Sequence, residues 1–285
     1  MSTVPTPPPA LAYRVRGPSA GGDNPRRFWN LARTLAATDW KVRFYDSVLG
    51  YVWTLLRPLL LFGIVYFVFT YVVKAGAGVE FYGVMLLLGM IFHFFFAEVT
   101  AGGVTSMVDR ESLLRKVGFP RAVVPLSVAL VAAMNLVLNL VVLAVFVVGS
   151  GVSARWEWLL LPIPLALLVA FSTGLAMLLS ALYVPYRDVR PIWEVVLQAL
   201  FYATPILYPI ELLAAHSPTL AKIALMNPVA ALIQESRHLL VGAPSLTEAL
   251  GSTVLVAAPL AIGIGMTVLG FSVFDRMAPR AAEEL

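Results

Sequence analysis

Six long apolar windows constrain the fold of this chain of 285 residues more than any other feature. A helix needs about 20 consecutive apolar residues to cross a bilayer, because lipid cannot satisfy exposed backbone groups. The windows lie at about residues 52–73, 82–106, 122–148, 158–184, 192–208 and 249–274, and the fifth is short and interrupted by Pro205. We therefore predict an all-α integral membrane protein with six transmembrane helices.

The composition agrees with this prediction and excludes several classes of function. Hydrophobic residues make up 60% of the chain and charged residues 13%, which is about half the charged fraction of a soluble domain. The net charge of +4 is accounted for by topological signals beside membrane spans, so no nucleic-acid partner is expected. The chain has no cysteine, and His93, His216 and His238 are far apart in the sequence, so no metal site is expected.

Lysine and arginine residues predict the orientation in the membrane. If the N-terminus lies inside, sixteen of the twenty fall on inner segments, and the other four are Lys74, Arg155, Lys222 and Arg237. Both termini are therefore predicted to be cytoplasmic. Residues 1–25 hold six prolines and no apolar core, which predicts a disordered cytoplasmic tail and not a cleaved signal peptide. Residues 277–285 are predicted to form a cytoplasmic C-terminal tail.

Residues 26–50 precede the first span, and their first part, 26–42, has an amphipathic pattern. Phe28, Leu31, Leu35 and Val42 share one helical face, and mostly polar residues occupy the opposite face. This pattern predicts a helix lying on the inner membrane surface. The alternative is a solvated helix that only adds positive charge before the first span.

The outer segment 209–248 contains two short apolar stretches, LAKIALM and VAALIQESRHLLVG. Pro209, Pro218 and the pair Asn227 and Pro228 interrupt them. Because neither stretch can span a bilayer, we expect two half-helices within 209–240 that dip part-way into the outer leaflet. Two helices lying flat on the outside are the alternative.

The stretch DRESLLRKVGFPR, residues 109–121, places six charged residues between the second and third spans. Its signals predict a helix of about eight residues, with Asp109 as N-cap, Arg115 and Lys116 in the last turn, and Gly118 just past the end. A helix of about eight residues is marginal alone, so its apolar ridge needs a surface to pack on. That surface is either the chain's own inner face or another protein. The remaining alternative is a capped turn that only connects two spans.

The chain has no nucleotide-binding motif, so any energy source must be an ion gradient or a separate subunit. There is no Gly-Lys pair and hence no phosphate-binding P-loop. The ionisable candidates within spans, Glu98 and His93, are too few to indicate a proton relay. Asn135 and Asn139, one turn apart, are expected to hydrogen-bond to another helix. The energy is therefore expected to come from a separate subunit.

Four blocks of sequence carry a resemblance to a known family. The blocks are KVRFYDSVLGYVWTLLRPLLL (41–61), SLLRKVGFPRAVVPLS (112–127), YRDVRPIWEVVLQALFYATPILYP (186–209) and NPVAALIQESRHLLVG (227–242). In this order they resemble the ABC-2 type permease subunits of bacterial ABC exporters for O-antigen, teichoic acid, capsule and related cell-surface polysaccharides. The likeness runs over residues 26–276.

The resemblance implies a division of labour along the chain. Residues 109–118 resemble the coupling helix that sits in a groove of the ATPase, with Asp109, Arg110, Glu111, Leu113, Leu114, Arg115, Lys116, Val117 and Phe119 as contact residues. Residues 26–45 resemble the interface helix that borders it, and they precede the six-span permease domain of residues 51–276. The gate before the last span is expected to involve Pro205, Tyr208, Pro209, Asn227, Pro228 and Arg237.

The same resemblance implies the assembly and the substrate path. Two permease chains are expected to form a homodimer with two ATPase subunits, which bind the ATP and magnesium, so that this chain binds no cofactor. A conduit between the permeases is expected to be lined by Phe62, Tyr66, Phe92, Phe95, Phe96 and Glu98. Aromatic faces stack well on sugar rings, but the same residues are also expected in ordinary helix packing or against lipid. For Glu98 the alternative is a structural role as a protonated or water-bridged carboxyl group.

The expected function is export of a lipid-linked or polymeric glycan across the bacterial cytoplasmic membrane, with membrane lipids around the spans. Export of drugs or small lipids by the same architecture is one alternative. A membrane enzyme acting on a polyprenyl-linked sugar is another, but it needs clustered acid, base or metal residues. The inner aspartates are instead scattered, at Asp39, Asp46, Asp109, Asp188 and Asp275.

Overall fold

The computed structural model describes residues 24–43, 52–76, 78–114 and 119–284, and within these ranges the chain forms helices and turns but no strand. The first half consists of α1 (Pro25–Arg43), α2 (Val52–Phe67) with its π-helical continuation η1 (Val68–Val72), α3 (Tyr82–Asp109), α4 (Glu111–Leu114) and α5 (Val123–Gly149). The second half consists of η2 (Trp156–Leu160), α6 (Pro162–Tyr183), α7 (Val189–Ala203), α8 (Ile210–His216), α9 (Pro218–Leu225), α10 (Pro228–Val241), α11 (Leu246–Leu250) and α12 (Thr253–Glu284). The predicted all-α class is confirmed.

Five helical segments of the described chain are long and apolar enough to cross a membrane, which confirms a multi-pass membrane protein. They are Val52–Val72, Tyr82–Asp109, Val123–Gly149, Trp156–Tyr183 and Thr253–Ala278. The fifth predicted window, 192–208, holds α7, whose 15 residues extend about 22 Å. α7 ends because Thr204, which precedes Pro205, adopts an extended conformation with ψ of 136°. The count of six spans therefore stays a prediction.

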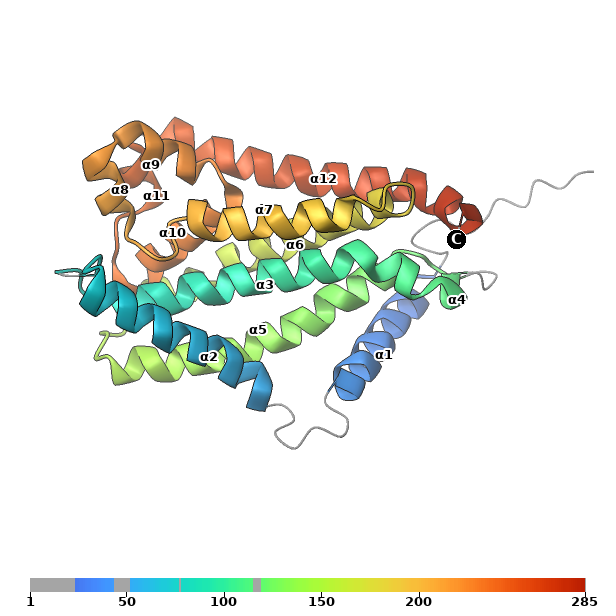
Figure 1. The fold of residues 1–285 in the computed structure, drawn as a ribbon, viewed down its shortest axis with the longest axis horizontal. Coiled ribbons are helices and arrows are strands. Elements are labelled where there is room, and N and C mark those ends of the chain that lie inside the picture. Colours follow the sequence, from blue (N-terminus) through green and yellow to red (C-terminus); the bar gives the residue numbers. More distant parts are fainter. Residues whose placement is uncertain (1–23, 44–51, 77, 115–118, 285) are drawn as a thin grey trace, which may run out of the picture.

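The helices differ strongly in how much of their surface is inside the bundle. The buried share is 78% for α3 and 61% for the span that contains α6, but only 17% for α12 and 6% for α2. α3 and α6 therefore form the centre of the bundle, with α5 and α7 beside them (Figure 1). α2 and α12 turn most of their side chains outward, where lipid or another chain can cover them.

α6 packs against α3 and α12 at positions without side chains. A Cβ atom on Gly103 would lie 2.5 Å from the Cβ of Ala176, where α3 crosses α6. A Cβ atom on Gly270 would lie 1.9 Å from the carbonyl oxygen of Gly174, where α12 crosses α6. Small residues let membrane helices approach until their backbones touch, and this packing holds the three helices together.

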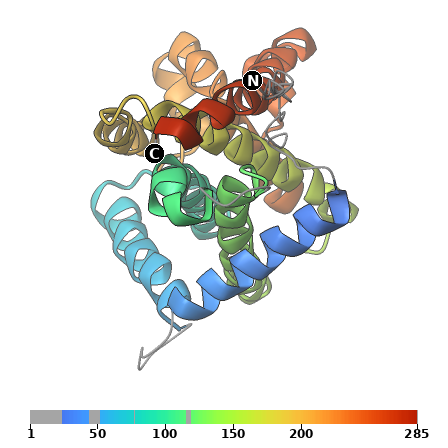
Figure 2. The same ribbon diagram turned by 90° about the vertical axis from the view of Figure 1, so that its right-hand side faces the viewer.

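The bundle has two distinct ends. α4 and the C-terminal end of α12 lie at one end, whereas α8, α9 and α11 lie at the other (Figure 1). Figure 2 looks onto the first end and shows α1 lying across the bundle below α4. The predicted coupling and gate segments therefore lie at opposite ends of the molecule.

α1 begins at Pro25 because the side chain of Asn24 caps it. The Asn24 Oδ1 atom accepts hydrogen bonds from the backbone N–H groups of Arg26 at 3.0 Å and Arg27 at 3.3 Å. α1 packs on α5 through the buried Ala32 and Ala36. Small side chains thus form the contact.

The predicted apolar face of α1 differs from this contact stripe. Phe28, Leu31 and Leu35 are half-buried beside it, but Val42 is 66% exposed. The contact with α5 also means that α1 is not a free solvated helix. Residues 44–50 of the predicted interface segment lie outside the described residues, as do residues 1–23 of the predicted N-terminal tail.

Candidate functional site

The charged segment after α3 folds differently from its predicted form. Asp109 does not cap a new helix, because it is the last residue of α3 and its carboxylate accepts a hydrogen bond from the Thr105 hydroxyl at 2.7 Å. Arg110 leaves the helical conformation, with φ of −122° and ψ of 27°, and the single turn of α4 follows it. Arg115, Lys116 and Val117 lie outside the described residues.

α4 packs on the end of the bundle through one leucine. Leu114 is 3% exposed and lies in a small apolar cluster with Met107 of α3, Met177 of α6 and Phe274 of α12. Leu113 and Phe119 are half-buried, while Ser112 is exposed. The end of the chain's own bundle is therefore one surface that α4 contacts, and it joins α4 to the ends of three spans.

An ion pair connects the predicted coupling segment to α1. Arg110 donates to the Asp39 carboxylate, and the two side chains are 20% and 30% exposed. Sequence reasoning missed Asp39 as a partner, although an acidic residue on an otherwise basic helix is the kind of signal that could have identified it. The pair fixes the position of α1 relative to the point where α3 ends.

The corner between α7 and α8 is held by the predicted gate residue Arg237. Its side chain is 1% exposed, and it donates hydrogen bonds to the carbonyl oxygens of Pro205 at 2.6 Å, Ile206 at 2.9 Å and Met85 at 3.2 Å. Burial lowers the pKa of Arg237 to about 10, so the guanidinium remains charged at neutral pH. One side chain of α10 therefore joins the corner to α3.

Two further side chains fasten the same corner. The Tyr82 hydroxyl donates to the Leu207 carbonyl at 2.6 Å, and the Asn227 amide donates to the Thr204 hydroxyl at 3.0 Å. The Asn227 Oδ1 atom also caps α10 by accepting from the Val229 N–H at 3.0 Å. Sequence reasoning missed Tyr82 and Thr204, because a contact between distant segments leaves no local signal.

The remaining gate residues lie on this corner or at the start of α10. Pro205 and Pro209 are buried, whereas Tyr208 and Pro228 are half-buried. α10, with 14 residues, is too short to span a bilayer, and it packs against α3, α6 and α12. α8 and α9, with seven and eight residues, lie at the end of the bundle instead (Figure 1). A gating role for these helices stays a prediction.

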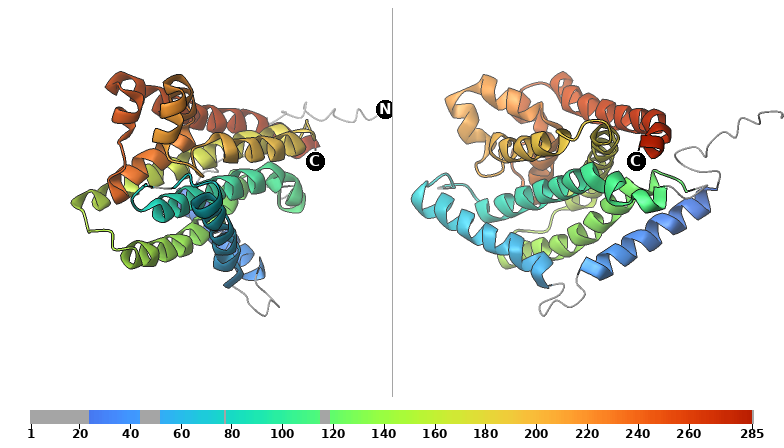
Figure 3. Two further views of the ribbon diagram at one scale, coloured as in Figure 1. Left: turned by 60° about the vertical axis from the view of Figure 1, so that its left-hand side comes forward. Right: turned by 45° about the vertical axis from the view of Figure 1, so that its right-hand side comes forward.

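A cavity of about 880 Å³ lies between α1, α2, α3 and α5. α1 and α2 lie on the same side of α3 and α5 (Figures 1 and 3), and the cavity occupies the space between them. Its polar lining consists of Arg43, Thr54, Arg57, Glu98, Asn135 and Asn139. Its aromatic lining consists of Trp53, Phe94 and Phe95.

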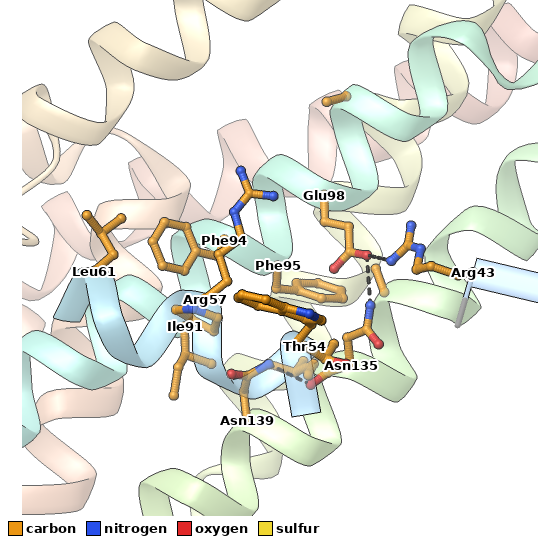
Figure 4. Close-up of a pocket in the computed structure, with 15 residues that line it drawn as sticks. Arg43, Thr54, Arg57, Leu61, Ile91, Phe94, Phe95, Glu98, Asn135 and Asn139 are labelled. Atoms are coloured by element: carbon orange, nitrogen blue, oxygen red, sulfur yellow. Dashed lines mark hydrogen bonds and ion pairs between the residues drawn. The ribbon is translucent and has the colours of Figure 1, made fainter. Parts of the chain in front are cut away.

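Glu98 is the centre of a hydrogen-bond network on one wall of this cavity. Its Oε1 atom pairs with Arg43 of α1 at 2.5 Å and accepts from the Asn135 amide of α5 at 2.8 Å (Figure 4). The Asn135 Oδ1 atom accepts from the Trp40 indole at 3.0 Å. The expected interhelical role of Asn135 is thus confirmed, whereas Asn139 donates to the Asn135 carbonyl within its own helix.

The six predicted conduit residues do not share one surface. Phe95 and Glu98 line the cavity, but Phe92 and Phe96 are each 1% exposed, and Phe96 stacks on Phe171 with ring centroids 5.7 Å apart. Neither Phe92 nor Phe96 lines the cavity, and a conduit role for the six residues stays a prediction.

Phe62 and Tyr66 of α2 pack inward as well. Their rings stack at 5.6 Å, and Phe62 also meets Phe146 of α5 edge-on at 5.4 Å. Phe62 is only 8% exposed. These aromatics therefore hold α2 against α5 within this chain.

Among the described residues, no three His, Asp or Glu side chains are grouped so that they could hold a metal ion.

Comparisons with known proteins cover most of the chain. A family model described as ABC-2 type transporter matches residues 30–241. Two Klebsiella pneumoniae proteins named O-antigen export system permease protein RfbA are 30% and 27% identical over 259 residues, or 90% of this chain and 95% of each relative. A Myxococcus xanthus protein of the same name is 30% identical over 207 residues, or 73% of this chain and 78% of that relative.

Proposed function

The chain belongs to the ABC-2 type transporter family, and we propose that it is the permease subunit of an ATP-driven exporter of O-antigen or a similar cell-surface polysaccharide. The substrate is a lipid-linked or polymeric glycan that crosses the bacterial cytoplasmic membrane. Similarity to export permeases over 90% of the chain is the observation that carries this proposal.

The working assembly consists of two permease chains and two ATPase subunits, which bind ATP and magnesium. This chain has no P-loop and binds no cofactor. The ATPase contacts the segment around α4, where Ser112 is exposed and Leu114 packs on the ends of α3, α6 and α12. A displacement of α4 is thereby passed to the spans as a rigid-body movement.

The end that carries α4 faces the cytoplasm, together with both termini. Sixteen of the twenty Lys and Arg residues favour this orientation. The natural chain has no cysteine, so single cysteines report position without background labelling. A membrane-impermeant maleimide should label Ala215→Cys in α8 from outside the membrane of spheroplasts and reach Ser112→Cys only after lysis. Labelling in the reverse order would refute the orientation.

A genetic and a biochemical experiment test the function together. Cells that lack the chain should lose their surface glycan and regain it with the wild-type gene. Affinity purification should recover an ATPase whose hydrolysis rate depends on the permease. An intact surface glycan in the deletion strain, with impaired export of small amphiphiles instead, would contradict the assignment.

A further inference from the structure

The cavity between α1, α2, α3 and α5 carries one positive charge that the described chain does not neutralise. Glu98 is already paired with Arg43 and hydrogen-bonded to Asn135. Arg57, an exposed residue of α2 on the cavity lining, has no hydrogen bond or ion pair with any described residue. Because a cation beside apolar helices is costly without a counter-charge, this arrangement favours an anionic ligand.

The remaining lining has the chemistry of a carbohydrate site. Trp53 and Phe94 supply aromatic surface, and Trp53 is 48% exposed, so its ring is open to a ligand. The Asn139 amide makes one hydrogen bond within α5 and keeps acceptor capacity on its oxygen. The volume of about 880 Å³ falls in the range of small-ligand pockets.

The surface next to the cavity is apolar. Leu60, Leu61 and Ile64 of α2 are 55%, 41% and 63% exposed, and Leu61 itself lines the cavity. A ligand whose anionic group lies beside Arg57 can therefore lay a hydrocarbon chain along α2. A lipid-linked ligand can therefore use the cavity and the apolar face of α2 together, which a free sugar phosphate cannot do.

We propose that this cavity binds the phosphate-bearing sugar end of a lipid-linked glycan, with the phosphate beside Arg57 and the first sugar against Trp53 and Asn139. The inference rests on the proposed function and adds to it the place where the anionic linkage is recognised. Arg43 belongs to the Glu98 network and positions that wall of the cavity.

The test uses the purified permease–ATPase complex in detergent and a defined probe, farnesyl diphosphate-linked N-acetylglucosamine, with binding measured by native mass spectrometry. Arg57→Gln should weaken binding about tenfold, the loss expected for one charge-assisted contact. Arg57→Lys should retain part of the affinity. The matched control is Arg276→Gln, which removes the same charge from an exposed position on α12 and should leave binding unchanged.

Competitors separate the sources of the anionic group. Phosphatidylglycerol and free pyrophosphate should each compete poorly with the probe, because the first lacks the sugar and the second lacks both the sugar and the hydrocarbon chain. Equal competition by phosphatidylglycerol, or equal binding by Arg57→Gln and Arg276→Gln, would overturn the proposal. The proposed function also fails if the wild-type complex does not bind the probe and the deletion strain keeps its surface glycan. Only the cavity assignment fails if the wild type binds the probe and exports glycan but Arg57→Gln does both equally well.

Discussion

Arg237 connects two segments of the chain by donating hydrogen bonds to three backbone carbonyl groups. Lysine at this position places its charge on one nitrogen and lacks the planar fork that reaches Pro205, Ile206 and Met85 together. We expect Arg237→Lys to lower the stability of the fold by about 2 kcal/mol, the value of a lost hydrogen bond to a charged group. Thermal unfolding of the purified complex measures this loss. Arg276→Lys, at an exposed position, is the control. Equal melting temperatures of the two variants would show that the hydrogen bonds of Arg237 do not stabilise the fold.

Gly89 of α3 leaves the space into which Arg237 fits. A Cβ atom there would lie 3.1 Å from Nη2 of Arg237 and 3.3 Å from Cγ2 of Ile206. Since three hydrogen bonds hold the guanidinium in place, Gly89→Ala should cost roughly 1–3 kcal/mol of stability through overpacking.

Gly63 of α2 gives the matched control for this substitution. A Cβ atom on Gly63 has no neighbour within 4 Å, so Gly63→Ala should be neutral or slightly stabilising in its helix. The double variant Gly89→Ala with Arg237→Lys should lose less stability than the two single variants lose in total, because both substitutions act on one contact. Full additivity in thermal unfolding would show that Gly89 and Arg237 act independently.

At the scale of helices, the crossing of α6 and α12 depends on the absence of a side chain. A Cβ atom on Gly270 would lie 1.9 Å from the Gly174 carbonyl oxygen, and that backbone cannot move without displacing α6. We expect Gly270→Ala to destabilise the protein by about 3 kcal/mol or more, at the upper end of overpacking costs. Gly265→Ala, in the same helix with no neighbour within 4 Å, should not. Protease resistance and thermal unfolding of the two variants in detergent provide the comparison, and equal stability would refute the crossing.

The long helices were predictable because an apolar run long enough to cross a bilayer is a strong signal in the sequence. The windows 82–106 and 122–148 correspond to α3 (Tyr82–Asp109) and α5 (Val123–Gly149) within three residues at each end. The place where α3 ends was less predictable. Asp109 has the sequence signature of a cap, but the helix includes it and breaks at Arg110, which pairs with Asp39 seventy-one residues away.

The sequence also could not predict which face of a helix lines the cavity. α3 is apolar all round, so its periodicity does not separate the cavity-lining Phe95 from the buried Phe92 and Phe96. Their positions depend on where α5, α6 and α7 pack, and that information lies in other segments. Arg237 was selected as a gate residue from the sequence, but its carbonyl partners emerged only from the fold.

At the scale of the whole molecule, two ion pairs place α1 between the coupling segment and the cavity. Arg110 at the end of α3 pairs with Asp39 of α1, and Arg43 at the end of α1 pairs with Glu98 on the cavity wall. A shift of α4 by the ATPase would therefore move α1 and, through it, one wall of the cavity. We therefore expect α1 to take part in transmitting the movement.

Charge reversal across the Asp39 and Arg110 pair tests this transmission. The partly exposed pair contributes only about 1 kcal/mol or less to stability, so Asp39→Arg and Arg110→Asp should leave the protein folded. Each single reversal should nevertheless reduce surface glycan and uncouple ATP hydrolysis from export, because two like charges then push α1 away from the coupling segment. The double variant restores opposite charges and should recover part of both activities.

The control for the charge reversal uses another ion pair of the same chain. Arg190 and Glu194 of α7 form an exposed pair at 3.0 Å, with side chains 58% and 55% exposed. Arg190→Glu and Glu194→Arg, alone or together, should leave surface glycan unchanged, because that pair lies within one helix and connects no elements. Recovery in the Asp39 and Arg110 double variant but not in its single variants would show that the charge contact itself carries the movement. If the double variant is as impaired as the single variants, α1 does not transmit it.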